Sequence, residues 1–127
     1  MQFKIKTSLK TANTLKDLQA RTKLTPNVLA RLAISLSLRD PTPVNDLELD
    51  NQVGLEFNRQ TLTGSYDAMY KVLVAQHAGK ALTDEEFFPE YIKKHMDRGA
   101  SKLKNEYDYA GNVEKFLINL ATLDKTI

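Results

Sequence analysis

The sequence predicts a mainly α-helical protein in which a short strand and two helices come first and a helical extension follows. Three observations support this fold class: an alternating start, two helical stripes separated by a capped turn, and further capped stripes after residue 54. At 127 residues the chain is long enough for a single domain. We divide that domain, residues 1–127, into a first part over residues 1–39 and a helical extension over residues 54–123.

The first residues alternate between polar and apolar side chains. Gln2, Lys4 and Lys6 are separated by Phe3 and Ile5. Successive side chains of an extended backbone point to opposite faces, so this pattern predicts a strand with one basic face and one apolar face.

Two helices are predicted after this strand. Apolar residues recur with helical spacing from Leu9 to Leu18, and Thr7 or Ser8 can cap the helix that they form. Thr25 then offers a hydroxyl to the free amides of a second helix, and Pro26 fits its first turn, where no amide hydrogen is needed.

The second helix is apolar on nearly every side, which is typical of a buried helix. A short strand and two helices cannot bury that surface alone, so we expect an intertwined homodimer, with Val28, Leu32 and Leu36 shared between chains. The order of elements is similar to a DNA-binding ribbon-helix-helix unit, in which two copies of the strand pair and their polar face enters the major groove. The alternative is an ordinary strand and helical hairpin, with Lys4 and Lys6 merely solvated.

Charge is distributed unevenly along the chain although the net charge is only +2. Residues 1–39 hold eight Lys and Arg residues against Asp17 alone, whereas residues 40–90 hold three basic and ten acidic residues. This asymmetry favours a polyanion-facing first part.

The extension begins after a connector that follows Pro41 and Pro43, in which Leu47 and Leu49 are the expected anchors. Helices are predicted from Thr63 or Ser65 to Gly79, from Thr83 onward with an interruption near Gly99, and over residues 113–123. The expected apolar stripes are formed by Tyr66, Met69, Tyr70, Leu73 and Val74, and in the last helix by Val113, Phe116, Leu117, Leu120 and Leu123.

Few residues suggest catalysis. Cysteine is absent, so no residue of this chain can act as a thiolate or carry a persulfide. His77 and His95 stand apart in the sequence with no acidic residue in a metal-ligand pattern, which favours structural roles for both. We predict no catalytic residue, no metal site and no cofactor. A nuclease or transferase that uses these histidines is the weakest alternative.

The N-terminus lacks an apolar signal block, and no apolar run approaches the length needed to span a bilayer. We therefore expect a cytoplasmic protein without a membrane partner.

Three blocks of sequence resemble the DndE family of DNA phosphorothioation proteins. They cover residues 21–33 (RTKLTPNVLARLA), 56–68 (EFNRQTLTGSYDA) and 95–99 (HMDRG), and the similarity extends from Leu15 to Leu103. This resemblance implies a small, mostly helical, homo-oligomeric DNA-binding subunit that works beside DndC and DndD and has no catalytic centre of its own. Phosphorothioation replaces a non-bridging phosphate oxygen of DNA by sulfur.

The leading hypothesis is therefore a non-catalytic subunit of the sulfur-modification machinery that binds duplex DNA, intact or nicked, mainly through phosphate contacts. The alternative is a ribbon-helix-helix transcriptional regulator. We expect a dimer or tetramer. The predicted DNA-binding residues surround the strand and the start of the second helix: Lys4, Lys6, Lys10, Lys23, Thr25, Asn27 and Arg31. If these are not the DNA face, Lys94, Arg98 and Lys102 form the next candidate stripe.

Overall fold

The computed structural model describes residues 4–49 and 53–122 and is mainly helical, as the sequence predicts. Gln2, Phe3 and Leu123 lie outside these ranges. The elements follow in this order: β1 (Lys4–Lys6), α1 (Leu9–Thr22), α2 (Pro26–Arg39), β2 (Glu56–Asn58), α3 (Arg59–Leu62), η1 (Gly64–Tyr66), α4 (Asp67–Ala78), α5 (Asp84–Glu86), η2 (Phe87–Ile92), α6 (Lys93–Ala110) and α7 (Val113–Ala121).

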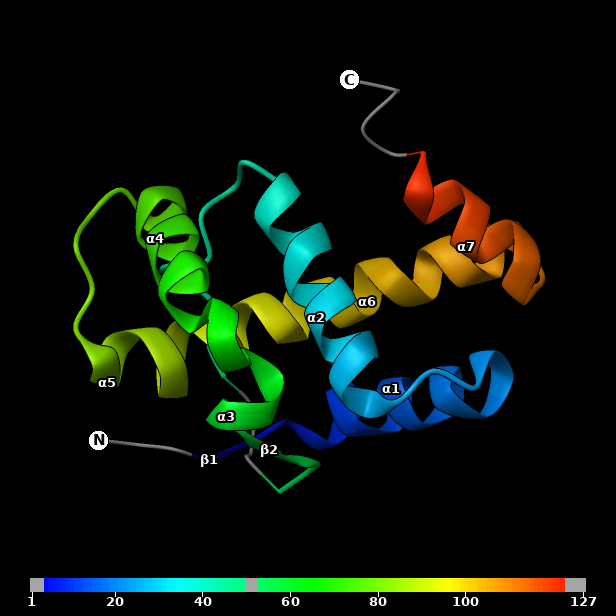
Figure 1. The fold of residues 1–127 in the computed structure, drawn as a ribbon, viewed down its shortest axis with the longest axis horizontal. Helices are drawn as coiled ribbons and strands as arrows, with labels where there is room; N and C mark the ends of the chain where they lie inside the picture. Colours follow the sequence, from blue (N-terminus) through cyan, green and yellow to red (C-terminus); the bar gives the residue numbers. More distant parts are fainter. Residues whose placement is uncertain (1–3, 50–52, 123–127) are drawn as a thin grey trace.

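Helix α6 runs along the long axis of the molecule, and α2 crosses it (Figure 1). Gly99 of α6 allows their close approach, because a Cβ atom at this position would overlap the backbone of Ala33 in α2. We predicted an interruption near Gly99, and this prediction is wrong, since α6 continues to Ala110. The absence of a side chain at Gly99 therefore makes room for α2 and does not interrupt α6.

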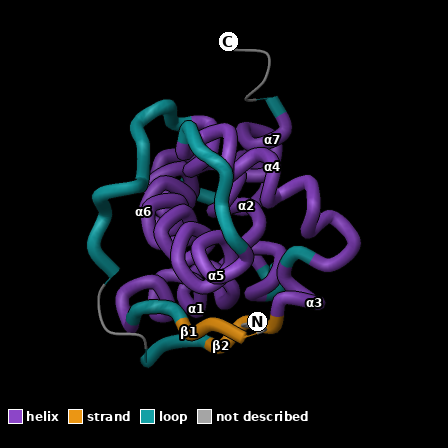
Figure 2. Tube along the Cα trace, turned by 90° about the vertical axis from the view of Figure 1, so that its left-hand side faces the viewer, coloured by secondary structure: helices purple, strands orange, loops and turns teal. Residues whose placement is uncertain are grey.

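β1 pairs antiparallel with β2 of the same chain, with Lys4 opposite Asn58, Ile5 opposite Phe57 and Lys6 opposite Glu56. This partner is a segment some fifty residues further along the same chain and takes one edge of β1, so pairing with a second copy of the strand at the other edge stays a prediction. The expected alternation is confirmed: Ile5 is buried while Lys4 and Lys6 are exposed. Figure 2 shows this small sheet along one edge of the helical body.

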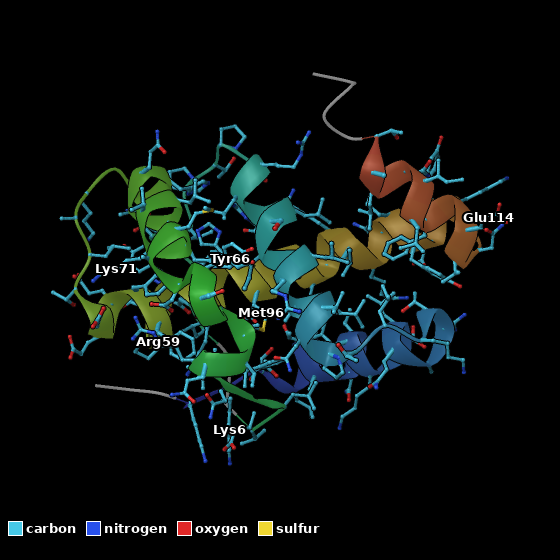
Figure 3. The ribbon with its side chains drawn as sticks, in the orientation of Figure 1. Lys6, Arg59, Tyr66, Lys71, Met96 and Glu114 are labelled. Atoms are coloured by element: carbon cyan, nitrogen blue, oxygen red, sulfur yellow. The ribbon has the colours of Figure 1, made fainter. Side chains whose placement is uncertain are left out.

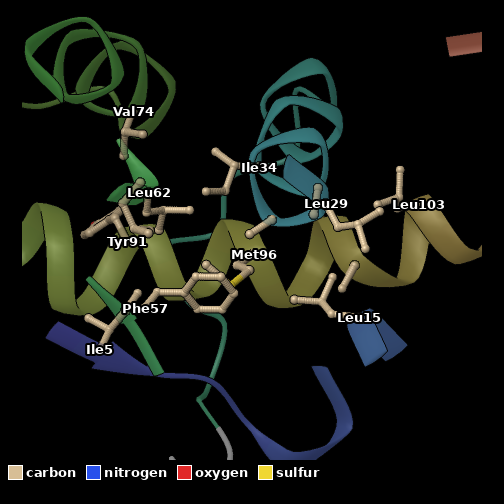
Figure 4. Close-up of a cluster of buried hydrophobic side chains, with 14 of the residues drawn as sticks. Ile5, Leu15, Leu29, Ile34, Phe57, Leu62, Val74, Tyr91, Met96 and Leu103 are labelled. Atoms are coloured by element: carbon tan, nitrogen blue, oxygen red, sulfur yellow. The ribbon is translucent and has the colours of Figure 1, made fainter. Parts of the chain in front are cut away.

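One hydrophobic core joins the first part of the chain to the extension. Ile5 and Phe57 lie near Met96 of α6 in Figure 4, and Leu15 and Leu29 belong to the same cluster. All five side chains are at most 3% exposed. We expected Val28, Leu32 and Leu36 to pack between two chains. Their side chains are already half-buried within one chain.

The start of the second half of the chain follows its local signals. Thr83 and Glu86 form a capping box at the start of α5, and Gly79 ends α4 with φ 78°. Between α5 and α6, residues Phe87–Ile92 form a π-helical turn. Pro89 lies inside it and has no amide hydrogen to give to a regular α-helical ladder, which favours such a local widening.

The predicted stripe of α4 does not pack as expected. Val74 is buried, but Tyr66, Met69 and Leu73 are 43–64% exposed. In α7, Phe116 is buried while Leu117 is exposed. Among the described residues, no helix is both long and apolar enough to cross a membrane.

Candidate nucleic-acid interface

The polar face of the sheet carries Lys4, Lys6, Glu56 and Asn58, because residues opposite one another in an antiparallel pair share a face. Lys4 Nζ lies 3.9 Å from Glu56 Oε2, and both side chains are more than half exposed. Lys6 projects from the lower edge of the molecule in Figure 3. An acid beside these two lysines makes the sheet less basic than a ribbon made from two copies of β1.

Helix α1 places Lys10 near one of its ends and Lys23 at the other. Ser8 caps the helix by accepting the Thr11 amide, and Lys23 ends it with φ 65°. The 14 residues of α1 span about 21 Å, so the two cations reach different parts of a ligand.

Lys16 belongs with this group, although we did not select it from the sequence. It is exposed and precedes Lys23 by seven residues, which puts both on the same side of α1. That spacing is the signal by which it could have been found.

Four of these cations share one property: within residues 4–49 and 53–122, no ion pair involves their side chains. They are Lys6, Lys10, Lys16 and Lys23. The one acid of α1 is already engaged, since Asp17 bonds Arg21 at 3.0 Å and lies 3.8 Å from Lys104. We call these four residues the α1 lysines; Lys6 precedes the helix on β1, and Lys10 lies about 120° around the helix from Lys16.

The start of α2 has mainly structural contacts. The Thr25 hydroxyl accepts the Val28 amide at 3.4 Å and so caps the helix, as predicted. Arg31 donates to the carbonyl oxygens of Thr61 and Leu62 at 3.0 and 3.2 Å, which ties α2 to α3. Asn27 Oδ1 is buried and has no hydrogen-bond partner among the residues described. Arg31, which we predicted to bind DNA, is thus held within the chain.

The alternative basic stripe on α6 is also engaged within the chain. Lys94 donates to Glu90 at 3.0 Å and to the carbonyl oxygen of Asn45 at 2.9 Å. Lys102 lies 2.9 Å from Asp40, and this hydrogen bond holds the pKa of the Asp40 carboxyl well below its usual range.

Arg98, the middle residue of that stripe, closes the C-terminal end of α2. Its guanidinium donates to the Ser37 hydroxyl at 2.8 Å, to the Ser37 carbonyl at 2.6 Å, and to the carbonyls of Asp40 and Thr42. These carbonyls lie at and just beyond the end of α2, where few backbone donors remain, although the Ser37 carbonyl also accepts the Asp40 amide at 3.1 Å. Its side chain is only 14% exposed.

The two histidines meet in this same region. Their rings make an edge contact with centroids 4.8 Å apart; His95 Nδ1 lies 2.8 Å from Ser37 Oγ, and His77 Nε2 lies 2.7 Å from the Asp40 carbonyl oxygen. Burial, together with the nearby His77 and Arg98, lowers the pKa of His95 to about 3. The sequence interpretation treated the two as isolated, and their separation of eighteen positions gave no sign of this contact.

A second polar network holds α3, α4 and α5 together. Arg59 donates to both carboxylate oxygens of Asp67, at 2.9 and 2.6 Å, and to Asp84 at 3.4 Å. Lys71 bonds the same Asp84 at 2.9 Å, and the rings of Phe87 and Phe88 lie about 5.5 Å from the Arg59 guanidinium carbon. Arg59 and Lys71 are labelled in Figure 3. The Arg59 hydrogen bond lowers the pKa of Asp67, and the Lys71 hydrogen bond lowers that of Asp84.

The described part of the chain contains no cluster of three or more histidine or acidic residues that could hold a metal ion. The polar clusters are instead ion pairs and helix caps.

Solved structures with a similar fold include two DndE proteins. The DndE of Escherichia coli B7A, involved in DNA phosphorothioation modification, has a TM-score of 0.67 and 21% identity; the match covers 81% of this chain and 97% of that one. A DndE mutant with two glycines changed to lysine, also involved in DNA phosphorothioation, has a TM-score of 0.65 and 20% identity, with 80% and 97% covered. A comparison with curated protein sequences found no significant match.

The sequence itself matches one family over most of its length. Residues 4–110 match the family described as DNA sulphur modification protein DndE, a range that runs from β1 to the end of α6. The two similar structures agree with that assignment at the level of the fold. The chain therefore belongs to the DndE family of DNA sulphur modification proteins.

Proposed function

We propose that this protein is a non-catalytic subunit of the DNA phosphorothioation machinery that binds duplex DNA, intact or nicked, mainly through phosphate contacts. The observation that carries the proposal is the exposure of the four α1 lysines, which have no ion pair within the described residues. Cations that are not neutralised within the chain can replace the counterions of DNA, which is the main source of non-specific affinity.

Phosphate contacts fit this surface better than base contacts. Lysine carries a compact charge on a flexible stem, whereas bases are usually recognised by two-pronged side chains such as Arg, Asn and Gln. Arg31 bonds backbone carbonyls instead. The ribbon-helix-helix regulator is the less favoured function, because the chain belongs to a family of DNA sulphur modification proteins.

The salt dependence of DNA binding tests this proposal. If each chain neutralises two or three phosphates, a dimer shows a log-log salt slope of roughly −4 to −5. Replacing Lys6, Lys10, Lys16 and Lys23 by alanine should flatten this slope and weaken binding to intact and nicked duplexes of several sequences alike. Lys115→Ala, an exposed lysine on α7, is the matched control.

Two results would contradict the proposal. An unchanged slope in the fourfold variant would show that the α1 lysines do not bind DNA. A loss of sequence preference on Lys4→Ala would instead favour base recognition and the regulator.

The sulfur chemistry is assigned to other proteins. No residue of this chain can carry a persulfide, because the sequence has no cysteine. We propose that DndC and DndD work with this subunit, in the cytoplasm. His77→Ala and His95→Ala should then leave DNA modification in cells largely intact in variants that fold, as measured by cleavage at phosphorothioate positions. A well-folded His95→Ala protein that abolishes modification would restore the enzyme hypothesis.

We also propose that the protein is a homo-oligomer, either a dimer or a tetramer. The support is the exposed apolar surface of α4, where Tyr66, Met69, Val72 and Leu73 are 43–66% exposed. Contiguous exposed apolar residues of this kind favour association. Light scattering should give a multiple of 14.4 kDa at micromolar concentration, and Met69→Glu should shift it toward the monomer. A monomer at all concentrations would contradict this.

A further inference from the structure

A pocket of about 390 Å³ lies between the start of α1, the connector before β2 and one side of α6. Its volume falls in the range of about 300–1,000 Å³ that is typical of small-molecule sites. The connector passes along α6 toward the sheet, as Figure 2 shows. Of the α1 lysines, Lys10 lines this pocket.

The connector gives the pocket an apolar wall. Leu47 and Leu49 line it, and Leu47 is 41% exposed. We expected these two leucines to anchor the connector in the core, but Val44 does so instead, with its side chain fully buried. The two leucines are therefore available to pack against a flat, apolar ligand group.

The facing wall on α6 is polar. Ser101 and Asn105 lie one turn apart, line the pocket and are exposed, and neither makes a side-chain hydrogen bond within the described residues. An amide side chain can donate and accept at once, as the edge of a nucleobase requires.

The charged groups that line the pocket are of both signs. Lys10 has no ion pair among the described residues and stands in the first turn of α1. Glu48 and Asp97 also line the pocket, and Asp97 accepts hydrogen bonds from Ser8 and Thr11 at 3.3 and 2.6 Å, so its carboxylate lies at the same end of α1. A ligand that carries both an anionic group and N–H or O–H donors matches this mixture of charges.

We infer that this pocket binds one nucleotide, with its phosphate at Lys10, its ring against Leu47 and Leu49, and its base edge toward Ser101 and Asn105. The same chemistry has two sources: a free nucleotide, and a nucleotide unstacked from bound DNA. The second source rests on the proposed DNA-binding function.

Fluorescence provides the test, because the chain contains no tryptophan. Leu47→Trp places a single indole in the pocket wall, where a stacked base should quench it. Leu117→Trp is the matched control, since Leu117 on α7 is 44% exposed and lies outside the pocket. The ligands are deoxyadenosine monophosphate, a fully paired duplex, and the same duplex with one unpaired adenosine. Circular dichroism verifies that both variants fold.

The nucleotide and the duplex with the unpaired adenosine should quench Leu47→Trp saturably and leave Leu117→Trp unchanged, while the fully paired duplex quenches it far less. Adding Lys10→Ala should raise the apparent Kd for the nucleotide about tenfold. Titration calorimetry of the unmodified protein with the nucleotide should show the same binding without a reporter. Equal quenching of both variants, or no binding in either measurement, would overturn the inference.

The two proposals fail in different ways. If duplexes bind with the expected salt slope but Leu47→Trp is not quenched, the pocket inference is wrong and the function stands. If the free nucleotide quenches Leu47→Trp but no duplex binds, the pocket stands and the DNA-binding function is wrong.

Discussion

Two regions of this protein carry basic residues at helical spacing, and they differ in what surrounds them. On α6, Arg98 and Lys102 are held by carbonyls and an acid of the connector and α2. On α1, Lys16 and Lys23 extend from the surface without an ion pair among the described residues. The α6 cations therefore hold the chain together, and the α1 cations are available to a ligand.

The difference shows that cation spacing alone does not identify a binding surface. In the sequence, a lysine at i, i+4 spacing gives no sign of whether its side chain meets solvent, a carboxylate from a distant loop or a phosphate. The partner is set by packing, since Asp40 reaches Lys102 only because α2 crosses α6. We therefore expect substitutions on α6 to change stability and substitutions on α1 to change binding.

The largest effect is expected where α2 and α6 approach most closely. Gly99→Ala should destabilise the protein by about 3 kcal/mol or more, because the added methyl group overlaps the Ala33 backbone, which cannot move without displacing α2. Ser101→Ala, an exposed position on the same helix, should change little. Urea denaturation measures both, and equal midpoints would mean that the helices can separate at low cost.

A matched pair of substitutions compares the two regions directly. Arg98→Met should cost about 2–3 kcal/mol of stability, because several carbonyls at the end of α2 lose a charged donor, and it should leave the salt slope of DNA binding unchanged. Lys16→Met should do the reverse, with stability nearly constant and the slope reduced by about 0.9 per chain. If both variants changed the same property, the distinction between the regions would be lost.

A smaller effect is expected from pH. His95 has a folded-state pKa of about 3, so it stays neutral in the folded chain while the unfolded chain takes up a proton below its ordinary value near 6.5. The unfolded state thus binds more protons as pH falls, and stability drops by about 2 kcal/mol between pH 6.5 and pH 5. The carboxylates with lowered pKa values lose their contribution at more acidic pH.

His95→Gln can keep a hydrogen bond to Ser37 but removes this titration. Its stability should therefore vary less than that of the parent chain between pH 6.5 and pH 5, as measured by denaturation at a series of pH values. The same pH dependence in both proteins would show that another group is responsible.

The sequence predicted well those features that neighbouring residues determine. Ser8, Thr25 and Thr83 cap helices as expected, and Gly79 ends one, because capping depends on residues within one turn. The role of Gly99 was predicted wrongly, because a sequence does not distinguish a glycine that allows another helix to pack closely from one that ends a helix. The pairing of β1 with β2 was missed for a related reason, since β2 lies about fifty residues away and is only three residues long.

The DNA-binding residues stay a prediction. Lys6, Lys10 and Lys23 are exposed as a phosphate contact requires, Lys16 is exposed too, and Arg31 bonds α3. In the family block 95–99, Asp97 accepts a hydrogen bond from the Thr11 hydroxyl, and Arg98 donates to a carbonyl at the end of α2. Gly99 makes room for the backbone of α2. The residues of this block therefore hold the fold together.

The contact between Arg98 and the end of α2 also has a consequence for how the chain is synthesised. The carbonyls of Ser37, Asp40 and Thr42 accept hydrogen bonds from the guanidinium of Arg98, a residue some sixty positions later in the chain. At about 5–20 residues per second, a ribosome needs roughly 3 to 12 seconds to cover that distance. The last turn of α2 should fray during this interval, and the first helical hairpin becomes fully protected against amide exchange only after α6 has emerged and docked.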